Sequence, residues 1–352
     1  MFMRKNLLVV FSVFFLFTKV FTQPQHYQNL VMEGGGIKGF AYVGAFEVLD
    51  SLGILQNIQR VGGSSVGAIQ AMLLATGYTT EEMKTIAAKI PLKTFNDGFA
   101  LGGFHRMKTK LGFFKGKAVT VWIDTLIAKK TGNANITFRE FHEQKEAKHY
   151  KDLYITGTDL TYQCPRVFSY ETYPDMKIKD AVRISMSVPL YFQPVYINDS
   201  GFVVKRNDTG HVHLMADGGL LDNYPITLFD DEKYGDCTTI GDRKQNTQTL
   251  GLILEKPEQI DYTKDHKGNY PLPVKTERNY FMAMYHTLID KPNPELTDSN
   301  SIHRTIMISN LNISGRVRTV STKTIVQFVQ SGQKGVRAFF AGKHTPLNNI
   351  EK

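Results

Sequence analysis

The amino-acid sequence predicts an α/β protein, with a three-layer α/β/α architecture around a mainly parallel central sheet. Short apolar segments of strand length alternate with longer segments of helical periodicity, which is the pattern of parallel strands joined by helices. Hydrophobic residues make up 42% of the 352 residues and charged residues 21%, which is a globular composition with enough apolar material for a large core. No internal repeat and no linker rich in proline and glycine divides the chain.

The N-terminal half predicts strand–helix pairs. Gly53 is well placed to end the first helix. Thr79 and Glu82 form a capping box that starts the third helix, and this helix ends before Pro91. The predicted elements are strands at 26–33 and 59–62 and helices at 40–52, 66–76 and 79–90.

The C-terminal half continues the alternation with shorter signals. We expect two strands to pair around the turn Asp199-Ser200-Gly201. The predicted elements are strands at 153–157, 166–169, 195–197, 203–205, 249–254 and 305–308 and helices at 178–187, 278–290 and 322–340.

One segment, Leu92–Val119, interleaves glycine, phenylalanine and lysine instead of alternating strands and helices. Aromatic and basic side chains on a flexible loop suit contact with a lipid surface. An ordinary excursion that packs on the core would have the same composition. Both interpretations stay open at this point.

The first 22 residues have the pattern of a signal peptide. Arg4 and Lys5 precede an apolar run at 7–17, and the sequence then turns polar. The apolar run is short for a membrane-spanning helix, which needs about 20 residues. The pattern predicts a secreted or extracytoplasmic protein, with an uncleaved N-terminal anchor as the alternative.

The chain is basic, with a formal net charge of +9. Removal of Arg4, Lys5 and Lys19 with a signal peptide leaves +9 − 3 = +6. This charge favours peripheral contact with an anionic membrane surface, although it also serves solubility. No cluster of lysine and arginine and no motif predicts nucleic-acid binding.

The spacing of metal-ligand residues predicts neither a metal nor a cofactor. No Cys/His spacing fits zinc, and no acidic loop fits calcium. Cys164 and Cys237 are the only cysteines, and either a disulfide between them or two free thiols fits the sequence.

The sequence Gly63-Ser64-Ser65-Val66-Gly67 lies between a predicted strand and a predicted helix. A nucleophile elbow needs this setting, because its sharp turn exposes the central serine and leaves no room for side chains at the flanking positions. Ser65 would also lie at a helix N-terminus, where the backbone dipole favours negative charge. The pattern predicts a nucleophilic Ser65.

A second glycine-rich loop, Gly34–Gly39, follows the first strand. Its amides could bind a dinucleotide phosphate, since Gly34, Gly36 and Gly39 have that spacing, or could form an oxyanion hole. Asp50 is the only acid at the distance a dinucleotide site needs, but it lies within a helix. With a nucleophile elbow at the next strand, we favour the oxyanion hole.

A third loop, Asp217-Gly218-Gly219, would by itself be a plain turn.

Taken in order, these motifs resemble the patatin-like phospholipase family. The resemblance runs from about Asn29 to Pro225, and the helix and proline turn at 178–194 belong to it. It implies a patatin-like phospholipase domain at 27–230, with 231–352 completing the same globular unit. It departs from the family pattern at Glu33, where aspartate is frequent, and at Lys38, where arginine is frequent.

The resemblance implies a lipid acyl hydrolase without a catalytic histidine, acting on phospholipid, lysophospholipid or neutral-lipid esters through an acyl-enzyme. By position, Ser65 is the nucleophile, Asp217 is the proton acceptor, and the amides of Gly34, Gly35 and Gly36 form the oxyanion hole. The supporting positions of the motifs are Lys38, Gly39, Gly63, Gly67, Gly218 and Gly219.

Two alternatives remain from the sequence. A Ser-His-Asp esterase would use His286 or His303 as its third member. A non-catalytic lipid-binding protein could keep the same fold, because fold alone does not imply activity.

Overall fold

The computed structural model describes residues 26–343, apart from 99–101, 241–242, 266, 268–269, 272–273, 278, 281–282 and 284–298. The predicted signal peptide at 1–22 and His286 lie outside the described residues, as does most of the helix predicted at 278–290.

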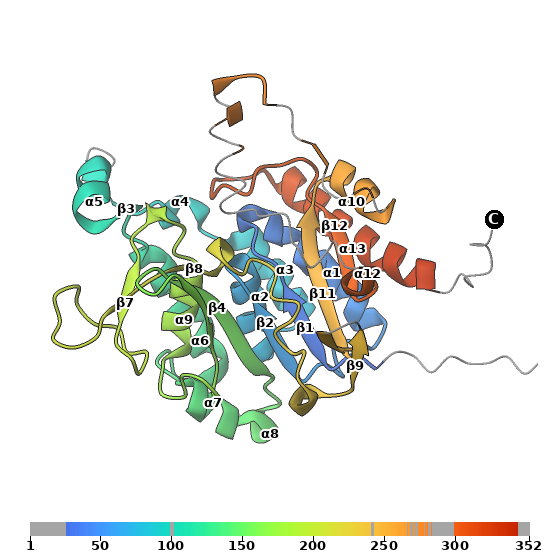
Figure 1. Cartoon of the computed structure of the whole chain (residues 1–352), viewed down its shortest axis with the longest axis horizontal. Helices are drawn as coiled ribbons and strands as arrows, with labels where there is room; N and C mark the ends of the chain where they lie inside the picture. The colour runs from blue at the N-terminus through green and yellow to red at the C-terminus, as the bar shows by residue number, and fades with distance from the viewer. Residues whose placement is uncertain are drawn as a thin grey trace, which may run out of the picture.

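An eight-stranded sheet forms the centre of the molecule (Figure 1). Five strands are parallel, in the order β12-β11-β1-β2-β4, and β5, β8 and β7 continue the sheet around β4 with antiparallel pairs. The predicted α/β fold with a mainly parallel central sheet is therefore confirmed. The strands are β1 (Asn29–Met32), β2 (Arg60–Gly63), β4 (Asp152–Asp159), β5 (Cys164–Phe168), β7 (Val195–Ile197), β8 (His213–Asp217), β11 (Thr249–Glu255) and β12 (Thr305–Ser309).

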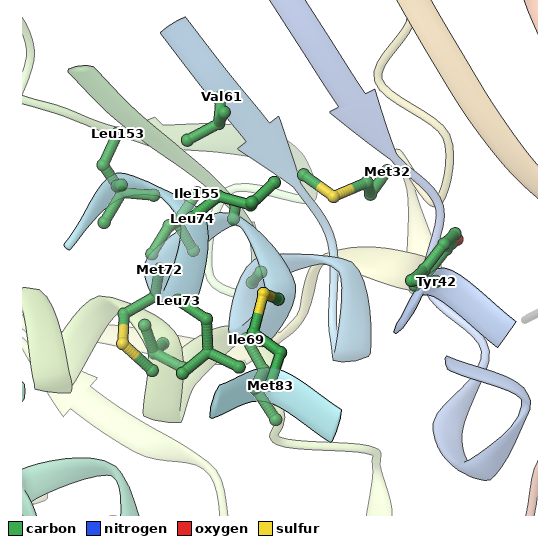
Figure 2. Packing of buried hydrophobic residues seen from close by; sticks show 14 of the residues in the cluster. Met32, Tyr42, Val61, Ile69, Met72, Leu73, Leu74, Met83, Leu153 and Ile155 are labelled. Carbon is green, nitrogen blue, oxygen red and sulfur yellow. The ribbon is translucent and has the colours of Figure 1, made fainter. Parts of the chain in front are cut away.

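Side chains alternate between the two faces of each strand, so the sheet has two cores. Val61 of β2 with Leu153 and Ile155 of β4 packs against α2, where Figure 2 shows them among Met72, Leu73 and Leu74. This face carries most of the helices, namely α1 (Phe40–Ser51), α2 (Val66–Ala75), α3 (Thr80–Lys89), α6 (Lys117–Thr131), α9 (Ile178–Ser185) and α13 (Thr322–Lys343).

The opposite face is covered mainly by a segment without long helices. Val31 and Tyr154 pack there against Phe229 and Tyr234. The remaining short elements are α7 (Phe138–Glu143), α8 (Lys145–Lys148), β9 (Cys237–Ile240), β10 (Arg243–Asn246), α10 (Pro257–Lys264) and α12 (Ser299–Ile302).

Local sequence signals explain several boundaries. Gly53 has φ of 72° just after α1, as its predicted stop requires. The Thr79–Glu82 capping box starts α3, with both reciprocal hydrogen bonds formed. The predicted pairing around the turn at 199–201 forms, but only as a short one: Ile197 bridges Val203, and the Val204 amide donates to the Tyr196 carbonyl at 2.9 Å. The longer pairing of β7 is with β8. The pairing with β8 is the longer one because β8 is itself part of the central sheet, where it pairs with β4.

Part of the segment at 92–119 packs on the core, as the second interpretation expects, and contact with a lipid surface stays a prediction. It forms α4 (Leu92–Phe95), α5 (Gly103–Lys110) and β3 (Gly112–Phe114), and β3 pairs in parallel with β6 (Leu190–Phe192). Phe113 and Phe114 contact one another and continue into Tyr191, whereas α5 stands away from the body of the molecule (Figure 1). We call residues 102–117 the basic arm.

Cys164 and Cys237 are free thiols. Within the part of the chain that the structure describes, no helix is both long and apolar enough to cross a bilayer.

Candidate active site

Three loops meet at the carboxyl edge of the sheet. The loop after β1 begins at Glu33, and β2 leads directly into Ser65. Strand β2 pairs with residues 152–155 of β4 and β8 with residues 157–159, so the end of β8, Asp217, comes to lie just beyond the end of β2. Crevices at this edge are the usual ligand sites of parallel α/β sheets.

Ser65 occupies the sharp turn between β2 and α2. Its backbone has φ of 51° and ψ of −120°, a conformation that a residue with a side chain rarely adopts. The turn is tight enough that a Cβ on Gly63 would lie 2.5 Å from the Gly67 carbonyl, and one on Gly67 would lie 2.3 Å from the Met32 carbonyl oxygen. The Ser65 amide donates to Ser185 Oγ at 2.8 Å, which fixes the turn against α9.

The Ser65 hydroxyl and the Asp217 carboxylate are directly hydrogen-bonded. Ser65 Oγ donates to Asp217 Oδ2 at 2.8 Å, and the Gly219 amide donates to Asp217 Oδ1 at 2.7 Å. The Asp217 amide donates to the Ser187 carbonyl at 3.0 Å, so the backbone is held as well. Gly218 permits this arrangement, because a Cβ there would lie 2.3 Å from Thr156 Oγ1. The two residues that sequence reasoning placed together do lie together.

Burial changes the acidity of Asp217. The side chain is removed from water, and this desolvation raises its pKa to about 7, although the hydrogen bonds from Gly219 and Ser65 act in the opposite direction. A carboxylate with this pKa is a far better base at neutral pH than an ordinary aspartate.

The glycine loop packs directly on Ser65. A Cβ on Gly34 would lie 3.1 Å from Ser65 Cβ and 2.4 Å from Asn223 Oδ1, so this position has no room for a side chain. The Gly34 amide donates to the Asn223 carbonyl at 3.0 Å. Among the described residues, the amides of Gly35 and Gly36 have no such acceptor. These two amides, rather than that of Gly34, are available to an external oxygen.

Glu33 holds the glycine loop in place, a role that sequence reasoning did not assign. Its buried carboxylate accepts from the Leu254 amide of β11 at 2.7 Å and from Asn223 Nδ2 at 3.1 Å. Tyr42 of α1 donates to the Glu33 carbonyl at 2.7 Å. The sequence does contain a signal for this role, because an acid that directly follows a buried strand must find hydrogen-bond donors.

The other supporting positions pack the loop. Gly39 touches α2, since a Cβ there would lie 2.3 Å from Val66 Cγ2. The Lys38 stem lies along the loop, with its Cε 3.0 Å from where a Cβ of Gly35 would be. Gly36 has φ of 56°, and a Cβ there would meet the Gly315 carbonyl at 1.9 Å.

An apolar pocket opens beside the serine, with a cavity volume of about 60 Å³. Met186 forms part of its wall, and its sulfur lies 3.9 Å from Ser65 Oγ. Gly36 of the glycine loop and Val66, the residue after Ser65, also line the pocket. The rest of the lining comes mainly from helices α2, α3, α4 and α6 and includes Ile69, Leu73, Met83, Phe95 and Trp122. Pockets with such a lining bind apolar groups.

The histidine that a triad would need is not beside Ser65 among the described residues. His303 is exposed and precedes Thr305, the first residue of β12, so it lies at the amino edge of the sheet, opposite Ser65. No cluster of three or more metal-binding side chains occurs within the described part of the chain.

Fold and site together define an α/β protein in which a serine in a strained turn is hydrogen-bonded to a buried aspartate beside a glycine loop. The family model for patatin-like phospholipases matches residues 30–230, which is more than half of the chain. The chain belongs to the patatin-like phospholipase family, and it is therefore a carboxylic ester hydrolase by class.

Curated relatives are similar over much of the chain. An uncharacterized protein of Acanthamoeba polyphaga mimivirus is 29% identical over 88% of this chain and 92% of its own length. A probable lipid hydrolase of invertebrate iridescent virus 6 is 29% identical over 58% of this chain and 64% of its own length. In fold, the chain resembles VipD from Legionella pneumophila, with a TM-score of 0.55 at 18% identity, over 91% of this chain and 67% of that protein.

Proposed function

We propose that this protein is a lipid acyl hydrolase that cleaves carboxylic esters of lipids with a Ser65–Asp217 dyad. The observation that carries the proposal is the 2.8 Å hydrogen bond from Ser65 Oγ to a buried carboxylate whose pKa is raised to about 7. The name of the viral relative, a probable lipid hydrolase, and the apolar pocket beside Ser65 support a lipid substrate.

The first step forms an acyl-enzyme. Ser65 Oγ attacks the ester carbonyl carbon while its proton passes to Asp217 Oδ2. The amides of Gly35 and Gly36 bind the oxyanion, because they have no acceptor among the described residues and their loop packs on Ser65. When the tetrahedral intermediate collapses, Asp217 returns the proton to the departing alcohol oxygen.

The second step releases the fatty acid. A water molecule gives its proton to Asp217 and attacks the acyl carbon, and the bond to Ser65 Oγ breaks as that oxygen takes the proton back. Because Asp217 serves as the base in both steps, its proton must be mobile near neutral pH. A pKa of about 7 meets this requirement.

Covalent labelling and product analysis test the dyad against its alternatives. We expect a fluorophosphonate probe to label Ser65, and lipid hydrolysis to be lost in Ser65→Ala and Asp217→Asn. No labelling of Ser65, with folding intact, would favour a non-catalytic lipid-binding protein. Loss of activity in His303→Ala or His286→Ala, with folding intact, would favour a Ser-His-Asp esterase instead.

The proposed site of action is an anionic membrane surface, contacted through the basic arm. Four of its exposed residues are lysines, and no acidic residue occurs between 98 and 123. Phe104 on α5 is 67% exposed, and Leu190, which pairs with Gly112 of the arm, is 63% exposed in a left-handed backbone conformation with φ of 65°. Apolar side chains that project between lysines suit the interface between headgroups and acyl chains.

The proposed location is secreted or extracytoplasmic, on the basis of the signal-peptide pattern at 1–22. N-terminal sequencing of the protein from its native host tests this proposal. A mature protein that begins near residue 23 is expected, and a chain that retains residues 1–22 would overturn cleavage.

A further inference from the structure

The apolar pocket beside Ser65 contains one amide side chain, that of Gln70. Gln70 is the fifth residue of α2 and only 9% exposed, and it lines the pocket together with its helix neighbours Ile69 and Leu73. Its Oε1 is buried without a hydrogen-bond partner among the described residues. Buried amides in native proteins nearly always have a partner, so this one needs an explanation.

A bound water does not satisfy Gln70 well. A buried water typically makes about three hydrogen bonds, which requires several polar groups around it. The rest of the lining is aliphatic or aromatic, and the indole N–H of Trp122 is the other side-chain donor in it. A ligand that carries its own polar group into the pocket satisfies the amide without needing further protein partners.

The position of Gln70 in α2 predicts where along its length a bound ligand would carry this polar group. Ser65 is the N-cap of α2, so Gln70 lies five residues, or about 7.5 Å, along the helix from it. Met186 contacts the Ser65 hydroxyl and also lines the pocket, which connects the reactive oxygen to the channel. An acyl chain esterified to Ser65 would therefore pass Gln70 several methylene groups from its carbonyl.

We infer that Gln70 selects acyl chains that carry a hydroxyl group near mid-chain. An amide side chain has an acceptor oxygen and a donor nitrogen, and its terminal torsion can turn either atom toward a ligand. A hydroxyl both donates and accepts, so it can bond to whichever atom of Gln70 faces it. The inference rests on the proposed function in that it names the acyl group on which the Ser65–Asp217 dyad acts. It makes Gln70 a specificity-determining residue, not a catalytic one.

Binding of free fatty acids tests this inference without requiring catalysis. Calorimetric titration would compare palmitic acid with hydroxypalmitic acids whose hydroxyl occupies successive positions. We expect one mid-chain isomer to bind the wild-type protein about tenfold more tightly than palmitic acid. In Gln70→Met, which keeps the length of the side chain but removes its polar atoms, palmitic acid should become the tighter ligand.

Leu73→Met is the matched control, since it alters the shape of the same pocket without changing its polarity. It should change the affinities for both acids together and keep their ratio. Matched nitrophenyl esters of the two acids then give the ratio of kcat/KM in the same three proteins. We expect that ratio to follow the ratio of affinities.

The outcomes separate this inference from the proposed function. Equal affinities of wild type for palmitic acid and every hydroxylated isomer overturn the role of Gln70, even where esters are hydrolysed. The same conclusion follows if Gln70→Met keeps the preference. Conversely, selective binding without hydrolysis of any ester overturns the proposed function and leaves the role of Gln70 intact. The comparison of ligands on the wild-type protein is informative even if Gln70→Met fails to fold.

Discussion

The burial of one carboxylate determines the chemistry available to Ser65. An exposed aspartate has a pKa near 4 and is a weak base toward a serine hydroxyl. Desolvation raises the pKa of Asp217 to about 7, and among the described residues the carboxylate accepts hydrogen bonds only from the Gly219 amide and the Ser65 hydroxyl. In the proposed mechanism this gives the site a base near neutral pH, and the fold is less stable when the buried carboxylate is charged.

Activity should therefore depend on ionisation of Asp217. Since the unprotonated carboxylate is the form that accepts the proton, kcat/KM should rise about tenfold between pH 6 and pH 8 and level off above. A pH profile with a non-titrating nitrophenyl ester checks this, with Ser65→Ala as the blank for uncatalysed hydrolysis. A profile that is flat above pH 5 would contradict the raised pKa.

The same carboxylate should make the fold less stable as the pH rises. Its pKa is higher in the folded than in the unfolded chain, so the folded state binds more protons between about pH 4 and pH 7, and stability falls across this interval. From pH 5 to pH 8 the free energy of unfolding should fall by up to about 3 kcal/mol relative to Asp217→Asn. Urea unfolding of both proteins at the two pH values measures the difference. If the two proteins respond equally to pH, Asp217 does not titrate in this range.

The turn at Ser65 stores backbone strain that glycine would release. Ser65→Ala and Ser65→Gly both remove the hydroxyl, but only glycine adopts φ of 51° with ψ of −120° without strain from a Cβ. Both variants should lose activity, and Ser65→Gly should be more stable than Ser65→Ala by about 1–3 kcal/mol. Thermal unfolding compares them directly. Equal stability of the two variants would show that the elbow is unstrained.

At the scale of helices and strands, sequence reasoning succeeded where a local rule fixes the structure. The glycines around Ser65 predicted the turn, and Thr79 with Glu82 predicted the start of α3. Whether a carboxylate would approach Ser65 could not be derived from local rules. The register of β8 on β4 brings Asp217 there, and the family resemblance supplied that pairing.

Other elements were missed for physical reasons. Helix α6 was not predicted, although Val119, Ile123, Leu126 and Ile127 recur at helical spacing, because the glycines and phenylalanines before it resembled a long loop. The parallel pair of β3 with β6 joins segments more than 70 positions apart, and three-residue strands carry no periodicity. Glu33 was treated as a departure from a motif, whereas the structure makes it the anchor of the glycine loop.

The basic arm should bring the protein to anionic membranes. Lys108 and Lys110 are exposed on α5, and each lysine near an anionic surface contributes about 1 kcal/mol. Changing both to glutamine should weaken binding to phosphatidylserine-containing vesicles roughly thirtyfold, with little effect on hydrolysis of a short soluble ester.

The control changes two exposed lysines elsewhere, Lys129 on α6 and Lys148 on α8, to glutamine. Figure 1 shows α8 at the bottom of the molecule, away from α5 at the upper left. If both pairs of substitutions weaken vesicle binding equally, net charge attracts the protein and the basic arm is not its docking element. Phosphatidylcholine vesicles separate the apolar contribution, which Phe104→Ser should reduce.

On the scale of the whole molecule, the site depends on chain that lies beyond the matched family region. All of β1 pairs with the first part of β11, and the Leu254 amide of β11 donates to the Glu33 carboxylate at the glycine loop. Residue Gly315 also touches this loop, since its carbonyl accepts from the Ile37 amide at 3.1 Å. The glycine loop is therefore held both by Asn223, inside the matched family region, and by residues that lie beyond that region.

Helix α13 closes the fold by packing on α1, and the two backbones come into direct contact (Figure 1). A Cβ on Gly332 of α13 would lie 1.9 Å from the Ala41 carbonyl oxygen, and one on Gly44 of α1 would lie 1.9 Å from the Val329 carbonyl oxygen. Neither backbone can yield easily, because α1 follows the glycine loop and rests on the core of the sheet.

Gly332→Ala should therefore destabilise the protein by about 3 kcal/mol, although alanine is the better helix former. Gly342→Ala provides the control, since this glycine lies in the same helix with nothing within 4 Å of its Cβ position, and its substitution should be neutral or slightly stabilising. Denaturant unfolding measures the change in the free energy of unfolding for both variants, and ester hydrolysis at a temperature where both variants are folded shows whether the active site is affected.

The same variant tests whether residues 231–352 complete one globular unit with the site. If they do, Gly332→Ala should lose activity in the same denaturant transition in which it unfolds. Unfolding of α13 at a lower denaturant concentration than loss of activity would instead show that the C-terminal part folds separately.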